Sequence, residues 1–200
     1  MFYQPAKGHG LPHDPFKAIV APRPIGWIST RSKDGSLNLA PYSFFNAIST
    51  HPHLLFFSSE GEKDSVRNAR ETGEFVCNLV SADLFEQMNK SSVDAPRGTS
   101  EFDYAGLTPT DCRLVRTPRV AEAHAALECR VTDIQEPRGL EGRVAGVFLV
   151  FGEVVGVHID ESIMTDGLVD IVKAGTVSRL GYMDYAKVTE VFSARRPRWE

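Results

Sequence analysis

Small polar and aromatic side chains crowd residues 23–46, the segment whose residue types best suit ligand binding. It reads RPIGWISTRSKDGSLNLAPYSFFN, and the turn-like KDGS at 33–36 divides it into two strand-like runs. Asp-Gly between extended segments predicts a hairpin, because glycine supplies the positive φ that a tight reversal needs. Hydroxyl, amide and aromatic groups on these strands suit a flat ligand with a polar edge better than a dry sheet core. The residues that carry this expectation are Trp27, Ser29, Thr30, Asn38, Tyr42, Ser43 and Asn46.

A second group of polar residues opens a predicted helix over 63–71. Lys63, Asp64 and Ser65 stand at its start, where free backbone N–H groups and the helix dipole favour an anion. A simple helix cap explains the same residues. Combined with the hairpin, they indicate an aromatic ligand that carries a phosphate. Arg179, in the late segment SRLGY, would add a charge or stack on a ring, or form a surface salt bridge.

Familiar catalytic and metal-binding patterns are missing from the sequence. It has no G-x-S-x-G elbow, no P-loop and no G-x-G-x-x-G after a strand. His51 and His53 would share a strand face, but no acidic partner stands near them, so we predict no metal site. Cys77 and Cys129 lie within apolar strand-like runs and are expected to be buried, reduced thiols. We therefore expect no catalytic triad and no residue with a nucleophilic role.

Length, charge and cysteine content limit the number of domains, the kinds of partner and the location that fit this sequence. The 200 residues fit one domain, 1–200, and the net charge of −4 gives no general attraction to nucleic acid. No apolar run is long enough to cross a bilayer, and the N-terminus lacks a signal pattern. The three cysteines are widely spaced and form no C-x-x-C pair. These features predict a cytoplasmic protein without a membrane or nucleic-acid partner.

Strand-like segments outnumber helical ones along the chain. The predicted elements are an irregular segment at 1–20, strands at 52–59, 74–80, 125–135 and 146–159, helices at 63–71 and 82–90, a long loop at 91–110, a polar-aromatic loop at 178–185 and a tail at 186–200. Their non-alternating order predicts a closed or partly closed antiparallel barrel rather than a doubly wound sheet. Gly152 and Gly156 suit the bends that a small barrel needs.

The predicted loop 91–110 has two interpretations. Phe102, Tyr104 and Leu107 are apolar enough to cover a bound ring, and Gly98 and Gly106 would permit movement. Alternatively, the loop lies on the surface and its aromatic side chains pack onto the barrel. The sequence does not decide between them.

Four segments in order carry a resemblance to a known family. They are PRPIGWISTRSKDGSLNLAPYSFFNAISTHPHLL, KDSVRNARETGEFVCNLV, FGEVVGVHID and SRLGYMDY, between Pro22 and Tyr185. Together they resemble the flavin reductase-like family with the FMN-binding split barrel. The resemblance implies a mainly β fold, a split antiparallel barrel of Greek-key type, and a homodimer that binds FMN near its interface.

The resemblance also implies roles for particular positions. The cofactor-binding set is Trp27, Ser29, Thr30, Asn38, Ser43, Phe44, Asn46, Lys63, Asp64, Ser65, Arg179 and Tyr185. Within it, the hairpin residues would line the ring system and ribityl chain, the helix start would lie near the phosphate, and the last two would approach from a late loop. Some family members have a His where Val147 or Phe148 stands here, so its role in nicotinamide binding does not transfer.

The implied activity is an FMN-dependent oxidoreductase that passes hydride from NADH or NADPH to flavin N5, with an oxygenase as a possible partner. Two alternatives stay open. One is an FMN enzyme that acts on a specific organic acceptor, and the other is a flavin-binding or flavin-sensing module without turnover.

Overall fold

A curled antiparallel sheet of seven strands forms the body of the protein in the computed structural model, which describes residues 1–96 and 98–199. Its strands are β2 (Gly26–Arg31), β3 (Leu37–Tyr42), β4 (Phe45–Thr50), β5 (His53–Glu60), β6 (Glu74–Asn78), β9 (Ala125–Gln135) and β10 (Val147–Ile159). The order across the sheet is β3-β2-β6-β9-β10-β5-β4. The edge strands β3 and β4 follow one another in the chain, and β3 contacts β5 near the opposite edge. The predicted mainly β, split-barrel fold is confirmed.

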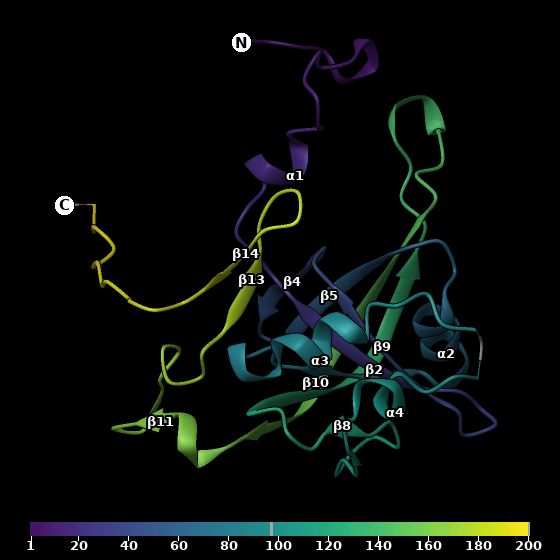
Figure 1. Ribbon diagram of the computed structural model, residues 1–200, viewed down its shortest axis with the longest axis vertical. Helices are drawn as coiled ribbons and strands as arrows, with labels where there is room; N and C mark the ends of the chain where they lie inside the picture. The colour runs from purple at the N-terminus through teal and green to yellow at the C-terminus, as the bar shows by residue number, and fades with distance from the viewer. Residues whose placement is uncertain (97, 200) are drawn as a thin grey trace.

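Shorter elements surround this sheet. They are the strands β1 (Arg23–Pro24), β7 (Pro109–Thr110), β8 (Arg119–Val120), β11 (Met164–Thr165), β12 (Leu168–Val169), β13 (Val177–Arg179) and β14 (Tyr185–Lys187), the helices α1 (Phe16–Ile19), α2 (Asp64–Thr72), α3 (Phe85–Lys90) and α4 (Glu101–Ala105), and 3₁₀ turns at Pro5–Lys7, Ala82–Leu84, Leu140–Gly142 and Glu161–Ile163. The N-terminal segment and the turn between β9 and β10 project from the same end of the barrel (Figure 1). Among the described residues, no helix is both long and apolar enough to span a membrane.

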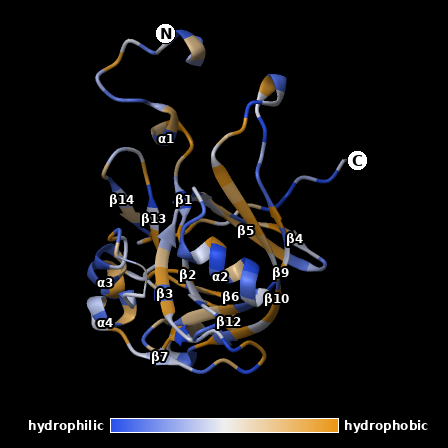
Figure 2. Ribbon diagram, turned by 90° about the vertical axis from the view of Figure 1, so that its right-hand side faces the viewer, coloured by the Kyte–Doolittle hydropathy of each residue, from blue (hydrophilic) through white to orange (hydrophobic). Residues whose placement is uncertain are grey.

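Both faces of β2 are covered, so neighbouring residues on this strand enter different parts of the core. Trp27 packs outside the barrel with Leu39 and Phe102, whereas Ile28 packs inside it with Phe57. Helices α3 and α4 lie on one side of β3 and α2 lies on the other (Figure 2). The groups that surround β3 therefore come from three helices far apart in sequence.

Glycines allow the sheet to close and bend. A Cβ atom at Gly26 would lie 2.6 Å from Cδ2 of Phe45, so β4 can cross close to β2 only because position 26 has no side chain. The pairing of β9 with β10 shifts register at Gly152 and again at Gly156. These irregularities confirm the bends predicted for the last long strand.

Local signals predicted the main elements well. The hairpin forms between β2 and β3, and the predicted helix 63–71 is α2, which ends at Gly73 with φ of 73°. The predicted helix 82–90 is a 3₁₀ turn followed by α3, and the four predicted strands correspond to β5, β6, β9 and β10 within two residues.

Two predicted loops contain regular structure instead. The segment 91–110 includes α4, whose Phe102 is fully buried, and Leu107 also belongs to the core, so these two side chains pack onto the barrel, whereas Tyr104 is 59% exposed. The segment 178–185 lies within the hairpin of β13 and β14. Both corrections concern elements of five residues or fewer, which are too short to show a periodic pattern. Position 97 of the predicted loop and position 200 of the predicted tail lie outside the described residues.

Candidate functional site

A groove runs along β3, between the start of α2 and the segment 91–95, and continues to β13 and β14. It consists of two pockets of about 470 and 310 Å³, and Pro41 and Ser92 line both of them. These volumes lie in the range of small-molecule and cofactor sites, about 300–1,000 Å³. We call this feature the β3 groove. Its lining includes Asn38, Pro41, Tyr42, Ser43, Lys63, Asp64, Ser65, Arg67, Ser92, Arg23, Arg179 and Tyr185.

In the first half of the β3 groove, the pocket of about 470 Å³, the hydrogen-bond donors come from the start of α2. Lys63 is the N-cap residue, and within the described residues no side chain caps the helix, so the first backbone N–H groups of α2 at this end of the groove are uncapped. The Asn38 amide donates to Ser65 Oγ at 2.8 Å, which fixes the serine against β3. Lys63 Nζ lies 3.6 Å from Asp94, and both side chains are exposed, so this weak pair leaves the lysine free to meet an anion.

Arg67 is a groove residue that the sequence interpretation missed. It lies one turn after Lys63 on the same helix face, and both line the same pocket. Its guanidinium contacts Asp64 Oδ1 at 3.2 Å and the Glu62 carbonyl at 3.2 Å, while Nε is buried without a partner among the described residues. Its position four residues after Lys63 is the sequence signal that could have identified Arg67.

In the second half of the β3 groove, the pocket of about 310 Å³, cationic and aromatic side chains from three segments lie together. The Arg179 guanidinium lies 4.3 Å from the centre of the Tyr185 ring, a stacked arrangement typical of arginine. Arg23, which is 6% exposed, donates to the carbonyls of Lys17, Val20 and Leu180. Burial, together with the charge of Arg179, lowers the pKa of Arg23. Arg23 was absent from the predicted set because its role depends on β13, its partner strand late in the chain.

Tyr42 forms part of the groove wall between the two halves. Burial raises the pKa of Tyr42, and hydrogen bonds with Ser65 and Ser59 oppose this only in part. The nearby carboxyl groups of Glu101 and Asp64 raise the pKa further. The phenol is therefore neutral at physiological pH and offers a hydroxyl rather than a charge.

Three side chains predicted to contact a ligand are fully buried instead: Trp27, Ser29 and Thr30. The indole N–H of Trp27 donates to Ser91 Oγ at 2.9 Å, and Ser29 Oγ donates to the Pro118 carbonyl at 2.6 Å. Thr30 accepts from the Asn68 amide at 3.1 Å. These bonds satisfy the polar atoms within the protein, so the three residues support the groove from behind rather than line it.

The remaining predicted residues divide between the groove and its surroundings. Phe44 is half-buried, with Lys17 and Arg23 at 6.0 and 5.7 Å from its ring centre. Asn46 is exposed and its amide oxygen accepts from the N–H of Ala47. The predicted residues that the structure does bring together in the groove are Asn38, Ser43, Lys63, Asp64, Ser65, Arg179 and Tyr185.

This set of donors fits a ligand with an anionic end and a planar ring system. The uncapped helix start, Lys63 and the orphaned Nε of Arg67 suit a phosphate, although Asp64 places one negative charge among them. Hydroxyl and aromatic groups in the second half suit the polar edge and faces of a ring. No nucleophile with a base in hydrogen-bond reach lines the described groove.

Sequence comparison extends over most of the chain. Residues 20–174 match the family model described as a flavin reductase like domain. An uncharacterized protein of Halalkalibacterium halodurans is 39% identical over 183 residues, which cover 89% of this chain and 87% of that protein. An uncharacterized protein of Aquifex aeolicus is 38% identical over 175 residues, with 84% and 86% covered.

Solved structures share the same architecture. Nitrilotriacetate monooxygenase component B from Bacillus cereus superposes with a TM-score of 0.88 at 30% identity and covers 97% of this chain and 98% of that chain. Pseudomonas fluorescens 2-nitrobenzoate 2-nitroreductase gives a TM-score of 0.80 at 27% identity, with 91% and 88% covered. The family model, the relatives and these structures agree with the fold, and this chain belongs to the flavin reductase-like family.

Proposed function

We propose that the β3 groove binds FMN and that this protein is an oxidoreductase which accepts hydride from NADH or NADPH. The observation that carries the proposal is the groove itself, which joins an uncapped helix start to an arginine stacked on a tyrosine in a flavin reductase-like domain. A flavin-related oxidoreductase follows from the family, whereas the choice of FMN and of a nicotinamide donor belongs to the proposal.

Different residues of the β3 groove would bind different parts of FMN. Lys63, Ser65 and the first N–H groups of α2 would bind the phosphate, with Arg67 as an additional donor. Arg179 and Tyr185 would limit the position of the ring system at the other end. When bound, FMN supplies the electron sink at N5 that hydride transfer requires.

The chain's own contribution to the reaction is positional. Pro41, Tyr42 and Ser43 form a continuous wall along β3 and the turn that follows it, and this wall would fix the plane of the ring. Hydride transfer needs a close, oriented approach of donor and acceptor rather than a proton relay. We therefore assign no general acid or base, and we expect binding geometry to set the rate.

Partner and assembly follow as part of the same proposal. The likeness to nitrilotriacetate monooxygenase component B supports a role in delivering reduced flavin to an oxygenase, and we propose a homodimer as the working form. A cytoplasmic location is supported by the three free cysteines. The likeness to a 2-nitrobenzoate 2-nitroreductase supports a second candidate, in which resident FMN reduces a specific organic acceptor.

An anaerobic absorbance titration tests the proposed activity. The purified protein would be measured alone, after addition of FMN, and then after addition of NADH or NADPH. A flavin spectrum that bleaches with either nucleotide supports the oxidoreductase and identifies its donor. Bound flavin that neither nucleotide reduces would replace it with the binding module, and failure to bind supplied FMN would refute the role of the groove.

A double variant tests the phosphate end. Replacing Lys63 and Ser65 with Ala removes two donors, each worth about 1.5–3 kcal/mol when hydrogen-bonded to a charged group, so FMN affinity should fall about 100-fold or more. Riboflavin, which lacks the phosphate, should lose much less. The matched control is Lys33→Ala, an exposed lysine outside the groove. Equal losses for FMN and riboflavin would defeat the assignment.

A further inference from the structure

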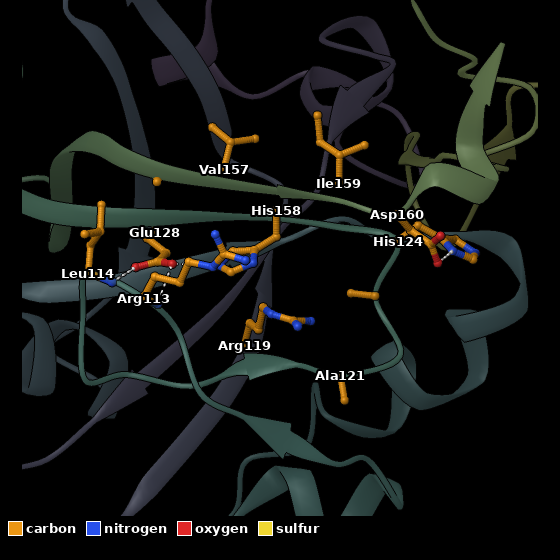
Figure 3. A pocket seen from close by; sticks show the side chains of 12 residues that line it. Arg113, Leu114, Arg119, Ala121, His124, Glu128, Val157, His158, Ile159 and Asp160 are labelled. Carbon is orange, nitrogen blue, oxygen red and sulfur yellow. Dashed lines mark hydrogen bonds and ion pairs between the residues drawn. The ribbon is translucent and has the colours of Figure 1, made fainter. Parts of the chain in front are cut away.

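A second pocket, of about 580 Å³, lies over β9 and β10, away from the β3 groove. The segment between β7 and β9 forms its other wall, so the pocket sits between the sheet and the chain that covers it (Figure 3). We call it the β9 pocket. Nothing in the proposed flavin chemistry uses it.

A buried carboxylate builds one side of the β9 pocket. Glu128 is 1% exposed, and its Oε2 accepts the N–H groups of Leu114 at 2.6 Å and Val115 at 3.0 Å. Its Oε1 accepts the N–H of Arg113 at 2.8 Å and lies 2.6 Å from Nε2 of His158. These four bonds hold the covering segment and the imidazole in place, and they occupy the acceptor capacity of the carboxylate.

The backbone of β10 leaves room for this arrangement. A Cβ atom at Gly156 would lie 3.1 Å from Cδ and 3.3 Å from Oε1 of Glu128. The register of β9 and β10 shifts just before this glycine, which places it opposite the glutamate. The carboxylate can therefore lie flat against β10 and still reach the covering segment.

Two arginines in the pocket have no carboxylate partner among the residues that the structure describes. Neither Arg113 nor Arg119 forms an ion pair within the described part of the chain, and Nε of Arg119 is buried without a hydrogen-bond partner. Figure 3 shows Arg113, Arg119 and His158 gathered around the same part of the pocket. Unpaired guanidinium groups in a concave, partly apolar site favour an anion that accepts from their planar N–H groups.

Charge and wall composition define the class of anion. Leu114, Ala121 and Ala123 of the covering segment supply apolar lining, whereas Val157 and Ile159 point to the other side of β10 (Figure 3). Asp160 places a carboxylate at the far end beside His124. Two arginines therefore face two acids, Glu128 and Asp160, and this balance suits a single negative charge better than a dianion. We propose that the β9 pocket binds a small organic carboxylate, with the carboxylate on Arg119 and Arg113 and a small apolar body against the covering segment.

A metal ion is the competing occupant. Ligand atoms of Cys112, Glu128 and His158 lie within 4.8 Å of one another. Two unpaired arginines would repel a cation there. Burial, followed by the charge of Glu128, raises the pKa of Cys112 to about 12, which disfavours the thiolate that a metal requires.

Calorimetric titration with benzoate tests the proposal on the full-length protein. Benzoate should bind at one saturable site, whereas benzyl alcohol, which lacks the charge, should not. Arg119→Met should weaken benzoate binding at least tenfold, and Arg116→Met, at an exposed arginine outside the pocket, should leave it unchanged. If Arg119→Met fails to fold, Arg113→Met, at an exposed position, provides the same comparison.

Several results would overturn the proposal. These are unsaturable benzoate binding, equal affinity in the Arg119 and Arg116 variants, or tighter binding of inorganic phosphate than of benzoate. Stoichiometric Zn²⁺ binding that Cys112→Ser abolishes would assign the pocket to a metal instead. Lys63→Ala, in the other groove, should leave benzoate affinity unchanged, so the outcome does not depend on whether FMN binds there.

Discussion

Removal of the Glu128 carboxylate should be among the most destabilising single changes in this protein. Glu128→Ala leaves the N–H groups of Arg113, Leu114 and Val115 without their acceptor and deprives His158 of its partner. An unsatisfied buried donor costs about 1–3 kcal/mol, and the two more exposed residues can recover part of this from water. We expect a loss of about 3–5 kcal/mol in the free energy of unfolding, comparable to breaking a buried ion pair.

Urea denaturation followed by circular dichroism measures this loss. With a slope of about 3 kcal/mol/M, the midpoint should fall by about 1–2 M. The control is Glu122→Ala, which removes a carboxylate that accepts the N–H of Thr108 at 3.1 and 3.2 Å on the exposed surface. It should cost less than about 1 kcal/mol. Similar midpoints for the two variants would refute the claim that Glu128 organises its surroundings.

The same residue should give stability a pH dependence. Burial acts to raise the pKa of Glu128, but the N–H of Arg113, the imidazole of His158 and the N–H groups of Leu114 and Val115 outweigh it, so the pKa lies below its ordinary value of 4.5. A carboxyl with a lower pKa in the folded state stabilises fully above its unfolded value and loses that contribution as pH falls through the folded value. The stability difference between wild type and Glu128→Gln should therefore be constant near pH 7 and shrink below about pH 5. A difference that does not change with pH would contradict this assignment.

Two further predictions concern the barrel interior. Burial raises the pKa of Cys77 to about 12, so its thiolate fraction at pH 8 is only ~10⁻⁴. The native protein should therefore react with Ellman's reagent far more slowly at this thiol than the urea-unfolded chain, and fast native labelling of Cys77, located by mass spectrometry, would contradict it. Gly152→Ala places a Cβ atom 2.6 Å from the fully buried Phe75 ring, and this overpacking should cost about 1–3 kcal/mol in urea denaturation. An unchanged midpoint would show that the ring can move aside.

Short-range patterns were sufficient to predict most of the fold. The Asp-Gly turn, the apolar runs and the glycine at the end of α2 depend on neighbours within a few residues, and the corresponding elements are present. The hairpin of β13 and β14 was missed because its strands are only three residues long. Its stability comes from pairing β13 with β1, more than 150 residues away. Contacts of that separation leave no local signal.

The candidate site was predictable to the extent that it is local. Lys63 and Ser65 stand at the start of a helix, so their position in the groove followed from helix geometry. Arg67 was equally accessible through its spacing, whereas Arg23 depends on carbonyls of two separate segments, one around α1 and one after β13. Glu128 gave no signal either, because its partners at 113–115 approach it only after the covering segment folds over β9.

The side chains of β2 that were expected to contact a ligand are buried in the structure. Trp27, Ser29 and Thr30 have the residue types of a ligand site, but both faces of β2 are buried. Polar atoms on such a strand must find partners within the protein, and those partners come from segments that the sequence does not connect. A polar strand therefore indicates either a ligand or a distant covering segment, and only the three-dimensional structure distinguishes the two.

These buried polar groups instead join the walls of the two pockets. The Trp27 indole holds Ser91, next to Ser92 of the β3 groove, while the Trp27 carbonyl accepts from the Asn78 amide at 3.0 Å. The Asn78 oxygen accepts the N–H of Val120 at 2.9 Å, directly after Arg119 of the β9 pocket. Each bond is buried and therefore expensive to break. The residues that first suggested a ligand thus stabilise the surfaces on which we propose that two ligands bind.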